Sequence, residues 1–152
     1  MKVARLYTRR IMATTRSAPI AEAAAAMQRF QVGTLLVMED PPAAGLPIGI
    51  VTDRDLALQG FASEASTVVS VMTPVIASIE EEADIHEALE QMRAHGVRRL
   101  LVTGPGGEGL RGILSIDDVV DCLSADLAAA AAVLKGEMRR DAAGLGDVKI
   151  GG

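Results

Sequence analysis

The sequence predicts an α/β fold built from two copies of one small unit with the element order β-α-β-β-α, followed by a C-terminal helical tail. Three observations lead to this prediction. One stretch of the chain aligns with a later stretch, short aliphatic segments have the length of strands, and a glycine-led strand in each copy passes directly into a helical pattern. One unit alone would bury little surface, so we expect the two to pack as a pseudo-two-fold pair.

Composition excludes several classes of protein. The 152-residue chain has a formal charge of −5, which argues against sequence-independent nucleic-acid binding. It is 49% hydrophobic, yet no run approaches the ~18 apolar residues of a membrane helix, so no membrane partner is expected. Its single cysteine, Cys122, excludes an intramolecular disulfide framework and a thiolate metal cluster. We therefore expect a cytoplasmic protein.

The internal repeat is the strongest feature of the sequence. Residues 11–37 align with residues 76–102 without a gap at an offset of 65, and ten of the 27 positions are identical. After two loops of unequal length the offset becomes 63, and Gly49–Leu56 aligns with Gly112–Val119. This register indicates a tandem repeat. The predicted organisation is a first unit at residues 3–62, a second at 68–125, and an alanine-rich helical extension with a loose C-terminus at 126–152.

Each unit is expected to begin with a short extended piece and a helix. These elements are predicted at Ile11–Thr15, Pro19–Phe30, Val75–Ile79 and Asp84–His95. The second helix carries apolar residues at positions i, i+3, i+4 and i+7, which form one face. Pro19 suits the first helical position because its missing N–H would be unpaired there. Gly96 suits the left-handed residue that ends a helix.

The second half of each unit is expected to contain two strands and a closing helix. Thr34–Met38 and Arg99–Val102 are aliphatic without alternation, which predicts strands buried on both faces. Loops rich in Pro and Gly follow these strands. The loops, at Glu39–Pro47 and Thr103–Arg111, precede the glycine-led strands, and the closing helices are predicted at Asp53–Gln59 and Ile116–Ala125.

The C-terminal tail is expected to contain a separate helix. Ser124 is predicted to cap it, and five alanines, at residues 128–132, favour helix because alanine has the highest helix propensity. This helix is predicted to reach about Arg140, and the chain after Asp141 is expected to be loose.

Each glycine-led strand ends at a hydroxyl residue, and an aspartate follows three positions later. The pairs are Thr52 with Asp55 and Ser115 with Asp118. One interpretation is a capping box, in which side chains and backbone N–H groups satisfy one another. The other is a ligand site, in which helix N–H groups bind phosphate and the carboxylate accepts from a ligand hydroxyl. Both remain open, because a cap can also face a ligand.

The repeat resembles a known family. The tandem units, the Glu-Ala-(x)₃-Met helix before an aliphatic strand, and Gly49–Leu56 (Gly-Ile-Val-Thr-Asp-Arg-Asp-Leu) resemble the CBS domain, which occurs in pairs as the Bateman module. The resemblance covers about Val3 to Ala125. It departs at the start of the first unit, where Leu6-Tyr7 stands in place of Val71-Met72-Thr73-Pro74.

The resemblance implies a set of ligand-binding residues. Hydroxyls would face phosphate and aspartates would face ribose at Thr52, Asp55, Ser115 and Asp118. Arginine suits bidentate phosphate contacts, which implicates Arg98 and Arg99 and, more weakly, Arg54. The apolar residues implied near adenine are Ile11, Met12, Val32, Val75, Ile76 and Val97. For these six the alternative is a place in the core.

The resemblance also implies a function. We expect a regulatory module that binds an adenosine nucleotide (AMP, ADP or ATP) between its units, requires no other cofactor, forms a homodimer and acts on an unidentified regulated protein. An enzyme is not expected, because no Ser-His-Asp, Cys-His or P-loop pattern occurs, and no metal-ligand spacing is found. The alternatives are a structural or dimerising adaptor with vestigial sites, and a sensor of S-adenosylmethionine or a dinucleotide.

Overall fold

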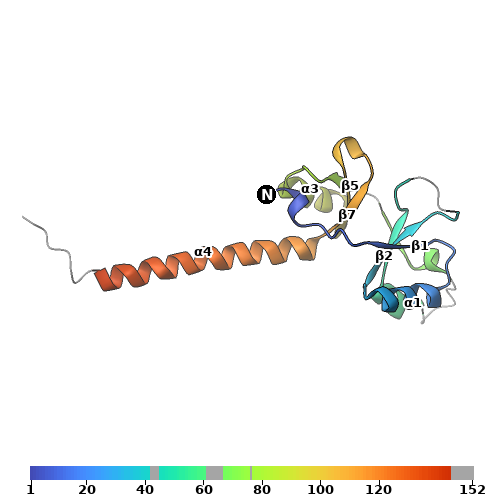
Figure 1. The fold of residues 1–152 in the computed structure, drawn as a ribbon, viewed down its shortest axis with the longest axis horizontal. Helices are drawn as coiled ribbons and strands as arrows, with labels where there is room; N and C mark the ends of the chain where they lie inside the picture. Colours follow the sequence, from blue (N-terminus) through green and yellow to red (C-terminus); the bar gives the residue numbers. More distant parts are fainter. Residues whose placement is uncertain (42–44, 61–66, 76, 145–152) are drawn as a thin grey trace, which may run out of the picture. The chain divides into compact units, whose positions relative to one another are not determined.

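The computed structural model describes residues 1–41, 45–60, 67–75 and 77–144 (Figure 1). The chain divides into two units, Met1–Ser115 and Ile116–Gly152. The first unit holds both copies of the repeat up to the end of the last strand. In the second unit the described residues form a single helix, α4 (Ile116–Gly144).

Two small sheets form the first unit, with strand orders β1-β2-β3-β4 and β5-β6-β7. In each sheet the first two strands are parallel and the following pairs are antiparallel. The bounds are β1 (Met12–Thr15), β2 (Thr34–Met38), β3 (Gly49–Thr52), β4 (Thr73–Pro74), β5 (Ser78–Glu80), β6 (Arg99–Thr103) and β7 (Leu110–Ser115). The α/β class and the β-α-β-β-α order expected for each copy are confirmed.

The helices follow the same repeat. They are α1 (Ile20–Phe30), α2 (Asp53–Asp55), which continues as a π-helical segment η2 (Leu56–Gly60), and α3 (Ile85–His95). Three short 3₁₀ segments are η1 (Val3–Arg5), η3 (Val68–Ser70) and η4 (Pro105–Gly107). The two closing helices therefore differ, because the first is a short mixed segment and the second is the long α4.

Local signals set the ends of α1 and α3. Pro19 has an extended ψ of 145° and is the N-cap of α1, so its expected place at the first helical position was wrong by one residue. Asp84 is the N-cap of α3, and Gly96, with φ 63°, ends α3 in the left-handed conformation as expected. Gln31 ends α1 in the same conformation, with φ 53°.

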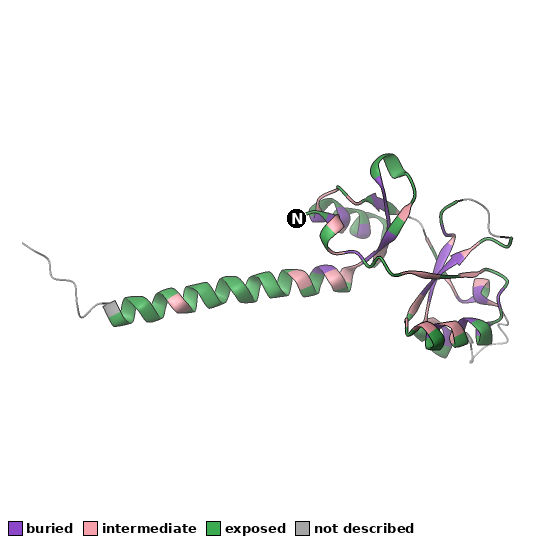
Figure 2. Cartoon of the chain, in the orientation of Figure 1, coloured by how far each residue is buried: buried purple, intermediate pink, exposed green. Residues whose placement is uncertain are grey.

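The middle strands are buried on both faces, as their composition predicted (Figure 2). In β2, Leu35 and Val37 pack into a helix-side cluster with residues of α1 such as Ala23 and Met27. Leu36, which points to the opposite face, packs into a different cluster. A central strand with two apolar faces has no polar alternation, and this explains the continuous aliphatic run.

The two sheets pack against each other through one group of side chains, the inter-sheet cluster. It contains Leu36 and Ile50 from the first sheet and Leu101 and Ile113 from the second. All four are at most 8% exposed. The two copies thus bury a common apolar surface, which is the expected pseudo-two-fold pairing.

The segment that precedes the second copy docks on the first copy. In this second lead segment (residues 67–74), the Val68 N–H donates to the Ala18 carbonyl at 2.9 Å and the Val69 N–H to the Arg16 carbonyl at 3.0 Å. The side chains of Val68 and Val71 are buried in the helix-side cluster of the first copy. The segment ends as β4, which pairs with β3.

The segment that precedes the first copy docks on the second in the same way. In this first lead segment (residues 1–8), the Val3 N–H donates to the Ala83 carbonyl at 3.0 Å and the Ala4 N–H to the Glu81 carbonyl at 2.8 Å. Thr8 exchanges two backbone hydrogen bonds with Ile113 on β7, at 2.9 and 3.2 Å. These contacts repeat those of residues 67–74 at an offset of 65, so the copies exchange their lead segments reciprocally.

Two glycines allow the lead segments to lie against the sheets. A Cβ added at Gly49 would lie 2.5 Å from Met72 Sδ and 3.0 Å from the Thr73 carbonyl oxygen. A Cβ at Gly112 would overlap the Tyr7 ring and the Thr8 carbonyl oxygen. The first lead segment departs from the family pattern in sequence, yet Tyr7 and Thr8 occupy the same place against the second sheet as Met72 and Thr73 against the first.

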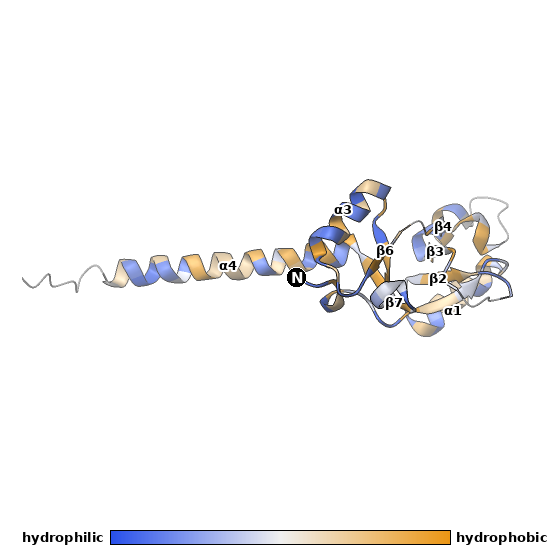
Figure 3. Ribbon diagram, turned by 90° about the horizontal axis from the view of Figure 1, so that it is seen from above, coloured by the Kyte–Doolittle hydropathy of each residue, from blue (hydrophilic) through white to orange (hydrophobic). Residues whose placement is uncertain are grey.

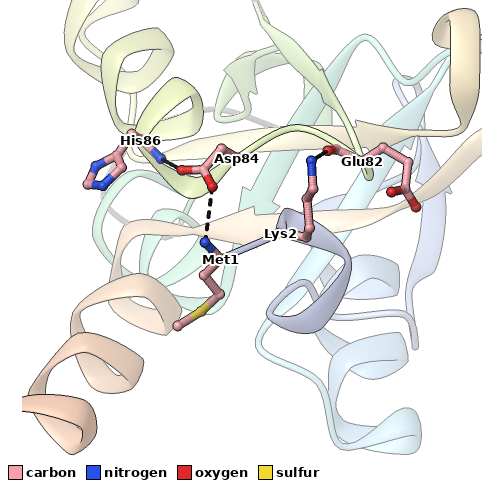
Figure 4. Close-up of polar contacts among 5 residues, drawn as sticks. All are labelled: Met1, Lys2, Glu82, Asp84 and His86. Atoms are coloured by element: carbon pink, nitrogen blue, oxygen red, sulfur yellow. Dashed lines mark hydrogen bonds and ion pairs between the residues drawn. The ribbon is translucent and has the colours of Figure 1, made fainter.

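The N-terminus meets the start of α3 (Figure 4). The Asp84 carboxylate accepts a hydrogen bond from the His86 N–H at 3.0 Å and another from the Met1 ammonium at 3.0 Å. Nearby, Lys2 Nζ donates to the Glu82 carbonyl at 2.6 Å. The His86 N–H, and then the Met1 ammonium, stabilise the charged carboxylate and hold the pKa of Asp84 below its usual value of 3.8.

Further expected element boundaries were wrong. Ser124 does not cap a separate helix, because α4 runs without a break from Ile116 to Gly144. The residues around Ser124 include no Gly or Pro, and the alanines that follow favour continuation. The expected strand Val75–Ile79 is also shorter, since Val75 donates its N–H to the Ile48 carbonyl at 3.1 Å instead of joining β5.

None of the helices in the described part of the chain combines the length and the apolar content that a membrane span requires. The expected loose end after Asp141 lies partly outside the described residues, which stop at residue 144.

Substitution of Gly112 tests the docking of the first lead segment. We expect Gly112→Ala to lower the free energy of unfolding by about 1–3 kcal/mol, because the added methyl group overlaps Tyr7 and Thr8. The control is Gly45→Ala, where no atom lies within 4 Å of the added Cβ. Urea denaturation gives both values, and equal effects of the two substitutions would contradict the close approach.

Asp84 gives the fold a pH-dependent contribution. A lowered pKa means that the charged carboxylate stabilises the folded state above pH 3.8, and that this is lost as the pH falls through the folded-state pKa. Asp84→Asn should therefore lower the urea midpoint at pH 7, and the difference from the parent should shrink towards pH 3. Glu90→Gln, at an exposed position of α3, is the control. A difference that stayed constant with pH would refute this assignment.

Candidate functional site

The first candidate site lies where β3 passes into α2. Thr52 Oγ1 accepts a hydrogen bond from the Asp55 N–H at 3.2 Å, and Asp55 Oδ2 accepts one from the Thr52 N–H at 2.9 Å. This is the capping box that the spacing predicted. Both residues are half-buried. A carboxylate has about four lone-pair sites, so Asp55 can accept further donors while it keeps the cap.

The surroundings of this box come from β2. Thr34 is the Cα partner of Thr52, and the Asp53 N–H donates to the Gly33 carbonyl at 3.0 Å. The Asp53 carboxylate lies beside Gly33, 3.4 Å from the position of a Cβ there. Arg54 is exposed, and its N–H donates to Asp53 Oδ1 at 2.8 Å. A ligand at this site would therefore meet a second carboxylate.

The second copy brings Arg99 and Ser115 together. They are Cα partners at the ends of β6 and β7, as Thr34 and Thr52 are in the first sheet. Both are half-buried, and Arg98, which precedes β6, is exposed. Asp118 lies in the first turn of α4, in the unit that begins at Ile116.

The apolar candidates separate into two groups. Ile11 and Val75 pack against the inter-sheet cluster, between the two copies. Met12 and Val32 pack against the helix-side cluster of the first copy, which is the packing of core residues.

Two apolar candidates remain. Val97 is half-buried, and its N–H donates to the Met92 carbonyl at 2.9 Å. Ile76 lies outside the described residues.

The two candidate sites differ in charge, which adds Asp53 to the residues of interest. The first copy has Gly33 beside Asp53, whereas the aligned positions of the second copy are Arg98 and Ile116. The first pair therefore carries one negative charge and the second one positive charge. The sequence already shows this difference, because both changes from the first copy to the second, glycine to arginine and aspartate to isoleucine, make the charge more positive. The contact between positions 33 and 53, however, becomes evident only in the structure.

This arrangement suits a ligand with a sugar and a phosphate. Carboxylates accept from ribose hydroxyls, whereas guanidinium groups and hydroxyls donate to phosphate oxygens. The apolar side chains of Ile11 and Val75 offer a surface for a flat ring between the copies.

Comparisons with solved structures identify the same architecture. The crystal structure of the CBS domain pair of protein MJ0100, in complex with 5′-methylthioadenosine and S-adenosyl-L-methionine, has a TM-score of 0.64 at 20% identity. The match covers 83% of this chain and 98% of that one. A CBS domain protein of Pyrobaculum aerophilum complexed with AMP has a TM-score of 0.59 at 25% identity, with 78% and 89% covered.

Curated relatives are similar to the chain in sequence. An uncharacterised protein of Bacillus subtilis, YlbB, is 36% identical over 101 residues, which cover 64% of this chain and 66% of the relative. An uncharacterised 17.7 kDa protein of Acidianus ambivalens is 29% identical over 123 residues, which cover 80% and 73%. The family model of the CBS domain matches residues 3–59 and again residues 68–125. The chain therefore belongs to the CBS domain family and carries the domain as a tandem pair.

Proposed function

We propose that this tandem pair is a regulatory module that binds an adenosine nucleotide, AMP, ADP or ATP, between its two copies. The observation that carries the proposal is the doubled arrangement of strand, hydroxyl and aspartate in two copies that pack on each other. The adenosine part has further support, because one similar structure contains AMP and another contains two adenosine compounds.

The second copy is the stronger phosphate site in this proposal. Arg99 lies opposite Ser115, and Arg98 stands where the first copy has Gly33. The first site has the Asp53 carboxylate next to Gly33, and a phosphate there would be repelled. Asp55 and Asp118 accept from ribose hydroxyls, and Arg54 contributes less because it lies next to the Asp53 carboxylate, which opposes phosphate binding.

The adenine ring is assigned to the apolar surface between the copies. Ile11 and Val75 are half-buried there and pack against the inter-sheet cluster. Val97 and Ile76 complete the proposed set with smaller contributions, whereas Met12 and Val32, which pack on the helix side, support the ring only indirectly. A ring in this position would contact both copies at once, so its binding energy depends on how they are arranged.

Regulation would follow because the binding energy of the ligand depends on how the two copies are arranged. A ligand shifts a conformational equilibrium only when it binds one arrangement better than another. The proposed ligand does so because it contacts both copies, and the regulated protein, still unidentified, would respond to the arrangement. In this proposal the chain is not an enzyme, acts in the cytoplasm and functions as a homodimer.

Titration calorimetry of the full chain tests the proposal. We expect binding of at least one of AMP, ADP and ATP, and a loss of about tenfold or more in affinity in the Arg98→Gln and Arg99→Gln double variant. Adenosine should lose less, because it has no phosphate. Arg93→Gln, at an exposed position of α3, is the matched control.

The negative outcomes of this titration separate the hypotheses. No binding of the three nucleotides, with Asp55→Ala and Asp118→Ala folded and identical to the parent, would reject the proposal. If only S-adenosylmethionine or a dinucleotide binds, AMP, ADP and ATP are rejected as the ligand, but the proposed site is retained. If none of these compounds binds, the chain is better explained as an adaptor with vestigial sites. The hydrogen bonds between Thr52 and Asp55, which satisfy both side chains without a ligand, support this alternative.

A stability measurement isolates the cap from the ligand contact. Without ligand, Thr52→Ala should lower the free energy of unfolding by about 1 kcal/mol, because the Asp55 N–H loses its acceptor. Thr52→Ser keeps the hydroxyl and should remain close to the parent. Urea denaturation provides the values, and equal stability of all three proteins would show that the cap contributes nothing.

A further inference from the structure

Ile11, a proposed contact of the adenine ring, lies in a short connection between the two copies. Three residues before it, Thr8 pairs with Ile113 on β7 of the second copy. One residue after it, Met12 pairs with Leu35 on β2 of the first copy. The chain therefore crosses from one copy to the other within four residues, and Ile11 packs against the inter-sheet cluster on the way. The position of Ile11 depends on both anchors.

The two lead segments are held to the sheets in different ways. The second lead segment ends as β4, a strand of the first sheet, and buries Val68 and Val71 in the helix-side cluster. The first lead segment meets β7 through an isolated bridge at Thr8, and it meets residues 81–85 through backbone hydrogen bonds. A segment opens locally at a lower cost in free energy when it is not part of a continuous strand ladder. We therefore expect the first lead segment to open before the second.

Side-chain contacts link the docked first lead segment to the connection that carries Ile11. Tyr7 is buried, and its hydroxyl donates to Glu81 Oε2 at 2.9 Å. Arg111 Nε lies 3.6 Å from Glu81 Oε1. The Arg9 guanidinium lies 4.4 Å from the centre of the Tyr7 ring, and Arg9 stands two residues before Ile11. Docking of Tyr7 therefore also restrains the start of the connection.

Opening of the first lead segment would leave the packing of the two copies in place. The inter-sheet cluster takes its four buried residues from β2, β3, β6 and β7, and β2 and β6 are largely hydrophobic (Figure 3). Ile11, by contrast, would lose its anchor at Thr8 and keep the one at Met12. A ring bound on Ile11 can therefore distinguish a docked segment from an open one while the copies stay together.

We propose that the first lead segment is a conformational switch coupled to the nucleotide site, and that the bound nucleotide holds it docked. This inference rests on the proposed function and deepens it, because it names the element that responds to the ligand. A ligand that prefers one of two states shifts the population towards that state. Without nucleotide the segment opens more often, which exposes Val3, Tyr7 and the edge of β7 at Ile113.

Amide hydrogen exchange of the full chain, followed by NMR, first tests whether the segment opens separately. The reporters are Val3 and Ala4, whose N–H groups donate to residues 81–83, outside the proposed ligand set. Without nucleotide they should exchange at least about tenfold faster than the N–H groups of Val68 and Val69 in the second lead segment. Equal or slower exchange would mean that the first lead segment opens only together with the fold, and would overturn the proposal.

The same measurement with AMP, ADP or ATP tests the coupling. If the nucleotide binds only the docked state, a concentration of 100 times Kd should slow the exchange of Val3 and Ala4 about 100-fold. The control is the Gly107 N–H, which donates to the Gly104 carbonyl in a loop and should keep its rate. Nucleotide binding in calorimetry without slower exchange would overturn the switch and leave the proposed function standing. Binding of none of the three nucleotides would overturn both.

A pair of double variants tests the coupling from the side of the lead segment. Tyr7→Ala with Thr8→Pro removes the buried ring and the N–H that donates to Ile113, so the segment should be mainly open. Nucleotide affinity should then fall at least about tenfold, in proportion to the docked fraction. Tyr7→Phe with Thr8→Ala keeps the ring and the N–H and should stay close to the parent.

The exchange rates of Val3 and Ala4 report in each variant whether the segment is open. An open segment with the affinity of the parent would overturn the proposal. If the Tyr7→Ala and Thr8→Pro variant does not fold, the exchange of the parent chain with and without nucleotide decides alone.

Discussion

The first unit depends on a close backbone approach that only glycine permits. Gly49 and Gly112 lead the two signature strands, and each leaves room for a lead segment that belongs to the other copy. Together with the inter-sheet cluster, this contact joins the copies on two sides. The glycine at the start of each signature strand is therefore a packing requirement, whereas the hydroxyl and aspartate at its end are the candidates for binding.

The same scaffold holds two sites that differ in charge. The hydroxyl and aspartate recur in both copies, but Gly33 and Asp53 in the first are replaced by Arg98 and Ile116 in the second. The strand ends next to these positions pair in the same way in both copies, Thr34 with Thr52 and Arg99 with Ser115, so the difference described here lies in the side chains. A duplicated fold can thus carry two sites of different preference through a few substitutions.

Local signals explain what could be predicted from the sequence. Gly96 and the apolar face of α3 marked that helix, and the spacing of Thr52 and Asp55 marked a cap that the structure contains. The exchange of lead segments could not be predicted, because it depends on contacts between residues far apart, such as Thr8 and Ile113. At Ser124 a local cap signal was present, but the helix propensity of its neighbours was stronger. The ligand-binding roles remain predictions.

The reciprocity of the lead segments bears on the origin of the pair. A single copy on its own would leave the docking edge of its sheet unfilled and its own lead segment without a place to bind. Two separate single copies could satisfy each other by exchanging these segments as a symmetric, swapped dimer. Joining them in one chain turns an encounter that depends on concentration into an intramolecular one. Residues at corresponding positions of the two copies then no longer need to be identical. The copies can diverge in sequence while each still binds the lead segment of the other.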